Sequence, residues 1–550
     1  MFWRRKKHNS EDTIKNDQNK ASDEQFGNGA ENLDEKSSKT KEPELASIDE
    51  ENKSTADTPE ENKTEDVYDI DDVIDGGGYG WYQRFVTLLA GMIWFTAAFQ
   101  TMVMTIIGDY LSCSWKIYRW QYALLVSIVF LCMSVGSPFF GYLGDNYGRK
   151  KAIGSYLLIQ FSFGAGASAS NNVITMIILM AFMGFGLGGF SQVIAYICEF
   201  YPAKDRGIAG FYTAYFWNTG TLLLILISWG LMTAFNNWRW VMFISAFPSL
   251  LVLIGIRWFP ESPRYYLVSQ QVEKAQKKLA VMSRMNKVEL PKGQLLHYRK
   301  NASEERGHFL DLFQPEHRKT ILLMWYIWFS TVFTYYSYAL ITPFIIKYGT
   351  IRISEEMLKE TVGVGNFTSH FYSVQPCKEF SNLNYIDLLW TTAAELPGLF
   401  IYSYLVIYIN RNTLLSIGFF LSMFCTFLLI VDTKFRFVLN VFLFLGRANI
   451  IAMFQMIFIM TTEAFPTTLR GLAVGSCAGI GRMGAGIAPF AIRLLITYNG
   501  IAAICILGFM LFFGTISAAS LPREMKDRTL KEITEEFDEP SKENVQSEIA

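Results

Sequence analysis

Three charged side chains lie deep inside apolar segments of this sequence. Glu395, Arg447 and Arg482 fall near the middle of long apolar runs, where a charge is costly and needs a partner or a function. One carboxylate against two guanidinium groups leaves an excess of positive charge, and arginine is suited to bidentate capture of a carboxylate or phosphate. The three residues therefore predict a binding site for an anion. An ion pair that ties helices together explains Glu395 and Arg447 equally well, and Arg482 less well.

The first half of the chain offers only uncharged polar groups at comparable depth. Gln100, Trp217 and Asn218 lie in its apolar runs. Their amide and indole groups would form a polar, aromatic wall of the same binding site. The alternative is plain packing, which is the more common role of a tryptophan within a helix.

A glycine-rich charged turn joins the second and third apolar runs, at Gly141–Lys151. Its glycines permit close approach and unusual backbone dihedrals. Asp145 can hydrogen-bond or face a helix N-terminus, while Arg149 and the lysines after it stay among lipid headgroups. We expect Asp145 and Arg149 to form part of a gate. The corresponding turn of the second half, at residues 408–412, has neither acidic residue nor glycine, which predicts a weaker lock there.

A short motif occurs once in each half, at the end of the fourth and tenth apolar runs. In both copies a glutamate is followed three residues later by proline and seven residues later by arginine. The copies are Glu199, Pro202 and Arg206, and Glu463, Pro466 and Arg470. Such repeats are typical of transporters with two related halves. A breakable gate between each glutamate and basic loop residues, and a static ion pair that fixes the loop, are equally good interpretations.

Composition explains where these side chains must be held. The chain has 550 residues, of which 51% are hydrophobic and 18% charged, whereas a soluble chain carries about a quarter. Its apolar runs match the thickness of a bilayer core. They predict helices at 84–107, 120–143, 152–169, 173–198, 208–234 and 240–259, and then at 320–346, 386–408, 413–431, 437–464, 472–496 and 501–520. We expect an all-α membrane protein with twelve transmembrane helices in two six-helix bundles.

The remaining segments complete the domain organisation. Residues 1–80 are expected to be a disordered acidic tail, because they hold too little apolar surface to offset ordering entropy. The bundles occupy 81–259 and 320–521. Between them, the loop 260–319 contains an amphipathic helix near 270–284. Residues 522–550 form a C-terminal tail.

Lysine and arginine collect in the loops on one side of the predicted bundles, which places that side and both termini in the cytosol. The loop 347–385 then lies on the opposite side. It contains the glycosylation sequon at Asn366. Cys113 and Cys377 also lie on that side, where a disulfide between them and two unpaired thiols both fit the sequence.

The turn at Gly141–Lys151 and the segment Pro260–Tyr265 resemble the major facilitator superfamily, in its sugar and organic-ion branches. The similarity extends over 65–522 and is strongest to the synaptic vesicle 2-related family, through segments such as Asp387–Gly398. It implies a vesicle membrane, the synaptic vesicle included, or the plasma membrane. Related cation transporters tend to carry Asp where Arg482 stands and anion transporters Arg, which favours an anionic substrate.

Relatives often have charged residues at positions where this chain has none. Ala97 and Gln100 stand where acidic residues are common, Met180 where arginine is common, and Leu224 where glutamate is common. The resemblance therefore does not imply proton coupling through carboxylates of the first half.

Together these features predict a secondary transporter of a small organic ion that works by alternating access, and they favour an anion over a cation. The alternative is a vesicle-membrane protein that keeps the fold but acts as a receptor or regulator with little transport. We expect no enzymatic activity, cofactor, metal or nucleic-acid partner. The lipid bilayer is the expected environment, and a monomer the expected state.

Overall fold

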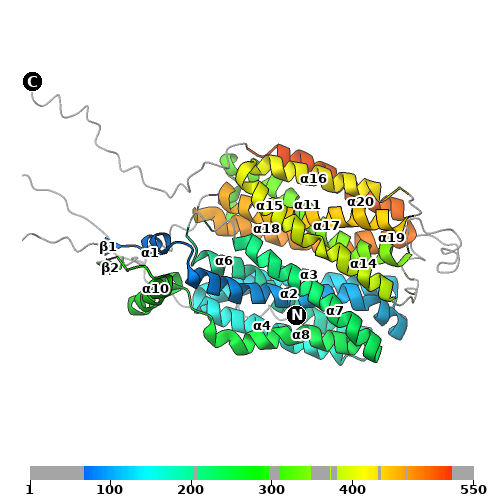
Figure 1. Cartoon of the computed structure of the whole chain (residues 1–550), viewed down its shortest axis with the longest axis horizontal. Coiled ribbons are helices and arrows are strands. Elements are labelled where there is room, and N and C mark those ends of the chain that lie inside the picture. The colour runs from blue at the N-terminus through cyan, green and yellow to red at the C-terminus, as the bar shows by residue number, and fades with distance from the viewer. Residues whose placement is uncertain are drawn as a thin grey trace, which may run out of the picture. The chain divides into compact units, whose positions relative to one another are not determined.

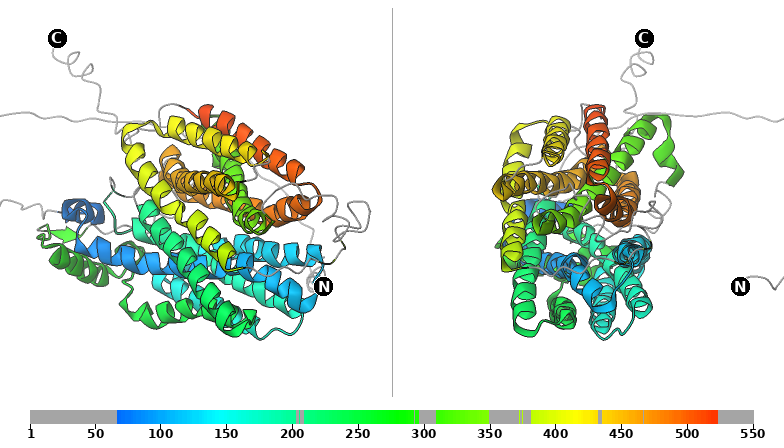
Figure 2. Two further views of the ribbon diagram at one scale, coloured as in Figure 1. Left: turned by 45° about the vertical axis from the view of Figure 1, so that its right-hand side comes forward. Right: turned by 90° about the vertical axis from the view of Figure 1, so that its right-hand side faces the viewer.

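The computed structural model describes residues 67–202, 205, 209–291, 293–295, 309–348, 372, 374, 381–431, 435–465 and 467–522. All of them belong to one compact unit. Almost all of its regular structure is helical, and the helices fall into two groups that follow the two halves of the sequence (Figure 1). Figure 2 shows the same division from two further directions, with the yellow-to-red helices of the second half gathered together.

The helices coincide with the predicted spans in both halves. In the first half they are α2 (Trp81–Trp115), α3 (Arg119–Tyr147), α4 (Arg149–Ser168), α5 (Val173–Leu187) with α6 (Gln192–Cys198), α7 (Ala209–Phe235) and α8 (Trp238–Ile254). In the second half they are α11 (Pro315–Tyr348), α14 (Asn382–Ala393) with α15 (Glu395–Tyr408), α16 (Arg411–Leu428), α17 (Arg436–Ala464), α18 (Thr467–Ala488) with α19 (Leu495–Tyr498), and α20 (Gly500–Ala519). Among the described residues, nine segments are long and apolar enough to cross a membrane. The arrangement is consistent with twelve.

Three of the spans are interrupted, which the sequence analysis did not anticipate. A 3₁₀ segment, Gly188–Ser191, separates α5 from α6. A turn at Ala394 separates α14 from α15, and the π-helical segment Pro489–Leu494 separates α18 from α19. Glycine weakens a helix, and a proline lacks the N–H that the preceding turn needs, so such residues are the usual causes of a break. Pro397 has this effect at the start of α15.

The outer faces of the bundles are apolar. Large side chains such as those of Val135, Ile174, Phe424 and Phe509 are exposed on α3, α5, α16 and α20. Continuous apolar surface of this kind is unfavourable in water and suits contact with lipid chains. The polar side chains of the spans are instead mostly buried between helices.

A small layer at one end of the bundles is built from the segment before α2 and the central loop. Strand β1 (Val67–Tyr68) pairs in parallel with β2 (Gln294–Leu295), and α1 (Ile70–Gly77) packs near α10 (Val272–Asn286) (Figure 1). The loop also contains α9 (Pro263–Val268) and a 3₁₀ segment, Phe309–Phe313. The amphipathic helix predicted near 270–284 is therefore present as α10.

This layer corrects the predicted end of the N-terminal tail. The tail was expected to be without structure through residue 80, but ordered elements begin at Val67. Helix α1 starts with a capping box in which the Asp72 carboxylate accepts the Asp69 N–H, which supports even a short helix. Asn286 of α10 then accepts the Tyr82 N–H at 3.0 Å and donates to Gln83 at 2.8 Å, so the loop helix holds the start of α2. Composition alone could not reveal these partners, which are distant in sequence.

Candidate functional site

A close approach between α15 and α17 sets the position of the buried charges. Gly398 lies against the backbone of Ala448, and a Cβ atom at residue 398 would come within 2.0 Å of the Ala448 carbonyl oxygen. Only glycine fits such a contact without displacement of the backbone. Glu395 precedes Gly398 by three residues and Arg447 is next to Ala448, so the contact brings the two charged side chains together.

Glu395 and Arg447 form a buried ion pair. Arg447 Nη2 lies 2.6 Å from Glu395 Oε1, and the two side chains are only 6% and 0% exposed. The other carboxylate oxygen accepts a hydrogen bond of 2.9 Å from Asn218 Nδ2 of α7, which also donates to the Thr392 carbonyl oxygen at 3.1 Å. The ion pair that the sequence left open as an alternative is therefore present. In addition, Asn218 of the first half bonds directly to the break between α14 and α15.

Arg482 has a different environment. It is 7% exposed on α18, and its guanidinium carbon lies 5.9 Å from the ring centroid of Phe190 in the first half. Tyr336 of α11 is close enough to interact with it electrostatically. Among the described residues, no carboxylate forms a salt bridge with Arg482. The structure thus places one buried arginine in an ion pair and leaves the positive charge of the other without a counterion from the described chain.

Aromatic rings from both halves surround these charges. We call them the midplane aromatic cluster, which consists of Trp94, Phe130, Phe190, Trp217, Tyr335 and Tyr336. Trp217 Nε1 donates to the Tyr335 hydroxyl at 2.7 Å across the two halves, and the rings of Phe130 and Tyr336 are 4.3 Å apart. Trp94 lies edge-on to Phe190 at 5.0 Å and to Trp217 at 6.0 Å. Of these rings, only Trp217 was predicted as a site residue, since aromatic residues make up 15% of the chain and give little signal.

Gln100 is not brought to this site. Its side chain is 1% exposed and its amide packs against Gly164, where a Cβ would lie 2.5 Å from Gln100 Nε2. Gln100 therefore points toward α4, within the first bundle. The expectation that it lines the same wall as Trp217 and Asn218 is not supported by this placement. Of the predicted neutral residues, Trp217 and Asn218 are the two that reach the second half.

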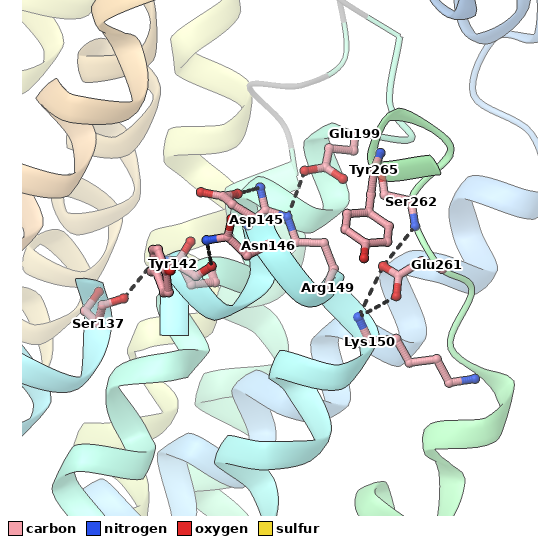
Figure 3. A network of polar contacts seen from close by, with 11 residues as sticks. Ser137, Tyr142, Asp145, Asn146, Arg149, Lys150, Glu199, Glu261, Ser262 and Tyr265 are labelled. Atoms are coloured by element: carbon pink, nitrogen blue, oxygen red, sulfur yellow. Dashed lines mark hydrogen bonds and ion pairs between the residues drawn. The ribbon is translucent and has the colours of Figure 1, made fainter. Parts of the chain in front are cut away.

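The predicted gate residues of the first half form one network (Figure 3). Arg149 lies 2.8 Å from Asp145 and 3.0 Å from Glu199, which joins the start of α4 to the ends of α3 and α6. We call these three residues the Arg149 network. Arg206, the basic residue of the repeated motif, lies outside the described residues. All three members belong to the first half, so their contacts do not cross to the second.

Glu261, in the loop after α8, completes the turn at the start of α4. Its carboxylate accepts the N–H groups of Lys150, at 3.2 and 3.3 Å, and of Ser262, at 3.2 Å (Figure 3). Burial raises the pKa of this carboxyl above its ordinary value, although the backbone N–H donors oppose the rise. Gly148, just before α4, has a φ of +101°, and a Cβ there would meet the Glu261 carboxylate at 2.6 Å. The turn therefore requires glycine for two separate reasons.

The second half has a simpler counterpart. Arg411, at the start of α16, forms an ion pair with Glu463 near the end of α17. This repeats the pairing of Arg149 with Glu199, and among the described residues no second carboxylate forms an ion pair with Arg411. The side chain of Arg470 lies outside the described part of the structure.

Two predicted features of the opposite side cannot be placed. Asn366, the sequon residue, and Cys377 lie outside the described residues. Cys113, at the end of α2, is disulfide-bonded. The other described cysteines are free, namely Cys132, Cys198, Cys425, Cys477 and Cys505. The pairing of Cys113 with Cys377 remains a prediction.

Comparison with known proteins identifies the family. The sequence profile described as "Sugar (and other) transporter" matches residues 84–381, more than half of the chain. The chain belongs to this family of the major facilitator superfamily. Its members are transporters rather than enzymes, so the sugar transporter family assignment confirms both the expected fold class and the expected absence of enzymatic activity.

Similar proteins agree with membership of the sugar transporter family. The synaptic vesicle 2-related protein of Xenopus laevis is 32% identical over 471 residues, which cover 86% of this chain and 84% of that protein. Organic cation/carnitine transporter 7 of Arabidopsis thaliana is 28% identical over 510 residues, covering 86% of this chain and 98% of that protein. The resemblance inferred from sequence motifs is thereby confirmed.

Solved structures establish the fold independently. The inward-open xylose transporter XylE from E. coli has a TM-score of 0.60 and 16% identity, covering 82% of this chain and 99% of that one. The same transporter bound to 6-bromo-6-deoxy-D-glucose has a TM-score of 0.59 and 17% identity, covering 80% and 96%. At this identity the similarity concerns the fold alone. This member of the sugar transporter family is therefore a multi-pass membrane protein with the alternating-access architecture.

Proposed function

We propose that this chain is a secondary transporter of a small organic anion, and that Arg482 binds the anionic group. The observation that carries the proposal is the contrast between the two buried arginines. Arg447 is neutralised by Glu395 at 2.6 Å, whereas Arg482 is buried with an aromatic neighbour and no carboxylate among the described residues. A buried cation without a counterion is costly, and an anionic substrate would remove that cost.

Buried polar atoms near the ion pair support a polar substrate. Arg447 Nε, Asn218 Oδ1 and Thr392 Oγ1 have no hydrogen-bond partner within the described structure. Buried donors and acceptors are normally paired, and an unpaired atom marks a place where a ligand or water can bind. These atoms offer both a donor and acceptors beside Glu395. A substrate with a carboxylate and a second polar group would satisfy them.

Alternating access follows from the way in which the site is divided. Asn218 and Trp217 come from the first half, and Glu395, Tyr335 and Arg482 come from the second. Rocking of one bundle against the other would make and break these contacts around a site near mid-depth. In both halves the loop ion pairs join helices of the same half, which supports their role as fixed braces. We propose that they keep each bundle rigid while it moves.

Location and orientation form part of the same proposal. The names of relatives such as the synaptic vesicle 2-related protein support a vesicle membrane, with the plasma membrane as the alternative. Both termini would lie in the cytosol, as the distribution of basic residues indicates. The loop 347–385 would then face the vesicle lumen or the outside, where Asn366 could be glycosylated.

Uptake by purified protein in proteoliposomes tests the proposal. A panel of labelled organic anions and cations should include at least one anion that accumulates in vesicles with the protein and not in empty ones. Arg482→Ala should lower that uptake by about ten- to a hundredfold, the loss expected for a charge-assisted hydrogen bond, and Arg482→Lys should lower it less. Arg84→Ala is the matched control, because Arg84 also faces an aromatic ring, that of Trp81, but is exposed at the start of α2.

The outcome also decides between transport and the second candidate function, that of a receptor or regulator. Ala97, Met180 and Leu224 are all buried and apolar, so the first half holds no buried charge at these positions. This favours a receptor or regulator if no substrate is found. Uptake of cations alone, or uptake that is indifferent to Arg482→Ala, would contradict the assignment of an anion. A pH gradient across the vesicles would then show whether any uptake is coupled to protons.

A further inference from the structure

A second group of aromatic side chains joins the two halves, far from the midplane site along the helices. We call it the Tyr385 cluster, which consists of Tyr110 of α2, Trp229 of α7, and Asn382 and Tyr385 of α14. The rings of Trp229 and Tyr385 stack with centroids 6.0 Å apart and an interplanar angle of 8°. The Tyr110 and Tyr385 hydroxyls lie 3.2 Å apart, and Trp229 Nε1 donates to Asn382 Oδ1 at 2.9 Å. Every one of these contacts crosses from one half to the other.

The cluster lies at the end of the helices opposite the Asp145 turn. Tyr110 is near the end of α2, Trp229 is in the last turns of α7, and Asn382 and Tyr385 are in the first turn of α14. This is the end that sequence analysis predicts to be exofacial. Tyr385 is 2% exposed, so its ring is enclosed between the bundles rather than displayed to solvent or lipid.

The cluster also stands directly over the proposed substrate site. Tyr385, Leu388 and Thr392 succeed one another on one face of α14, at intervals of three and four residues. All three are buried, and the Thr392 carbonyl oxygen accepts the hydrogen bond from Asn218. A substrate that reaches Glu395 from the predicted exofacial end would therefore have to pass Tyr385.

We propose that the Tyr385 cluster is the exofacial gate of this transporter, shown closed in this structure. The inference rests on the proposed function, since a gate has meaning only where a solute passes. The contacts of the gate among the described residues are stacking and neutral hydrogen bonds, whereas the ion pairs described at the other end join helices of the same half. Neutral contacts of this kind are individually modest, so they can be broken and remade in each cycle without stranding a charge.

Chemical labelling of a buried reporter tests the gate without knowledge of the substrate. Leu388→Cys places a thiol just below Tyr385, and a membrane-impermeant maleimide is added to sealed proteoliposomes. Leu383→Cys establishes sidedness, since Leu383 is exposed at the same end of α14. The rate is corrected for labelling of the chain that carries neither reporter. Trp229→Ala and Tyr385→Ala should each raise labelling of residue 388 from that side by about tenfold.

The control is an aromatic pair at the same end that does not join the halves. Phe235 and Trp240 lie 6.2 Å apart on α7 and α8, both in the first bundle. Trp240→Ala should leave the labelling rate unchanged. Tyr385→Phe keeps the stack with Trp229 but loses the hydroxyl contact with Tyr110, and should raise labelling by only about twofold. This conservative variant keeps the test valid if an alanine variant fails to fold, which size-exclusion chromatography would reveal.

Different results would contradict the gate proposal and the transport proposal. Unchanged labelling in Trp229→Ala, Tyr385→Ala and Tyr385→Phe overturns the gate, whatever uptake shows. An equal rise in Trp240→Ala also overturns it, because the effect would then be a general loosening of the helix ends. Increased labelling in the gate variants alone supports the gate as the closure between the halves. Absence of uptake in the unmodified protein would instead overturn only the transport proposal.

Discussion

The second half of the molecule carries its charges at mid-depth and has a simple loop. Glu395, Arg447 and Arg482 are all buried there, and an ion pair of Arg411 with Glu463 braces the loop end. Charges buried within membrane-spanning helices are costly, so each of the three needs a partner or a function.

The first half has the opposite distribution. Its loop end holds the Arg149 network together with the Glu261 carboxylate, while Asn218, its contribution to the site, is neutral. The comparison suggests that the two halves have different roles. In the transport mechanism that we propose, the first half would supply a rigid wall with hydrogen-bond donors, and the second would supply the charge that selects the solute.

The largest expected loss of stability comes from removing one partner of the buried ion pair between Glu395 and Arg447. Glu395→Leu leaves Arg447 buried without its carboxylate and should cost about 3–5 kcal/mol of folding stability. The double variant Glu395→Leu/Arg447→Met replaces both charges with apolar groups of similar size and should recover most of that loss. Thermal unfolding in detergent micelles measures both. A double variant as unstable as the single one would show that the cost lies in packing and not in the charge.

Sequence alone predicted much of the architecture, because the apolar runs are long and the charges between them are segregated. It also singled out Glu395, Arg447 and Arg482, since a charge within such a run is conspicuous. It left open which arginine pairs with Glu395. The choice depends on Gly398, which brings α15 against α17, and no local pattern encodes that contact.

The missed features share a physical cause. The midplane aromatic cluster and the Tyr385 cluster are made by residues distant in the chain, and aromatic residues are common throughout it. Gln100 was expected at the site because it is polar in an apolar run, but periodicity did not show which neighbour it faces. Its amide instead packs on Gly164 of α4.

Removal of the loop ion pairs should lower stability by less than removal of Glu395, and by different amounts in the two halves. Arg149→Ala removes contacts to two carboxylates, whereas Arg411→Ala removes one such contact among the described residues, that to Glu463. We expect losses of about 2 kcal/mol and about 1 kcal/mol respectively, because partly exposed pairs are screened by solvent. Thermal unfolding at low and high salt measures the difference, which salt should reduce. Equal losses would show that Asp145 adds nothing to the brace.

The two hydrogen bonds of Asn218 between the halves should contribute about as much to stability as the ion pair of Arg411. Asn218→Ala removes the bonds to Glu395 and to the Thr392 carbonyl and should lower stability by about 1 kcal/mol. Thr219→Ala is the matched control, since its exposed hydroxyl bonds only to the Tyr215 carbonyl of its own helix. Unfolding of the two variants side by side makes the comparison. A loss in Thr219→Ala as large as that in Asn218→Ala would remove the argument that the bond between halves matters.

The smallest expected effect is the pH dependence of stability that Glu261 contributes. The sign of this dependence shows whether burial of the carboxyl or its hydrogen bonds to the N–H donors dominates. Burial raises the pKa of this carboxyl, so the folded chain holds the proton more tightly than the unfolded chain does. Its contribution to stability must therefore fall as the pH rises from the ordinary pKa through the raised one. Glu261→Gln does not titrate, so the Tm of the unmodified chain relative to this variant should fall as the pH rises above the ordinary pKa of a glutamate carboxyl. A relative Tm that rises over this range would mean that the N–H donors of Lys150 and Ser262 outweigh burial, and that the first half's brace depends on the charged carboxylate.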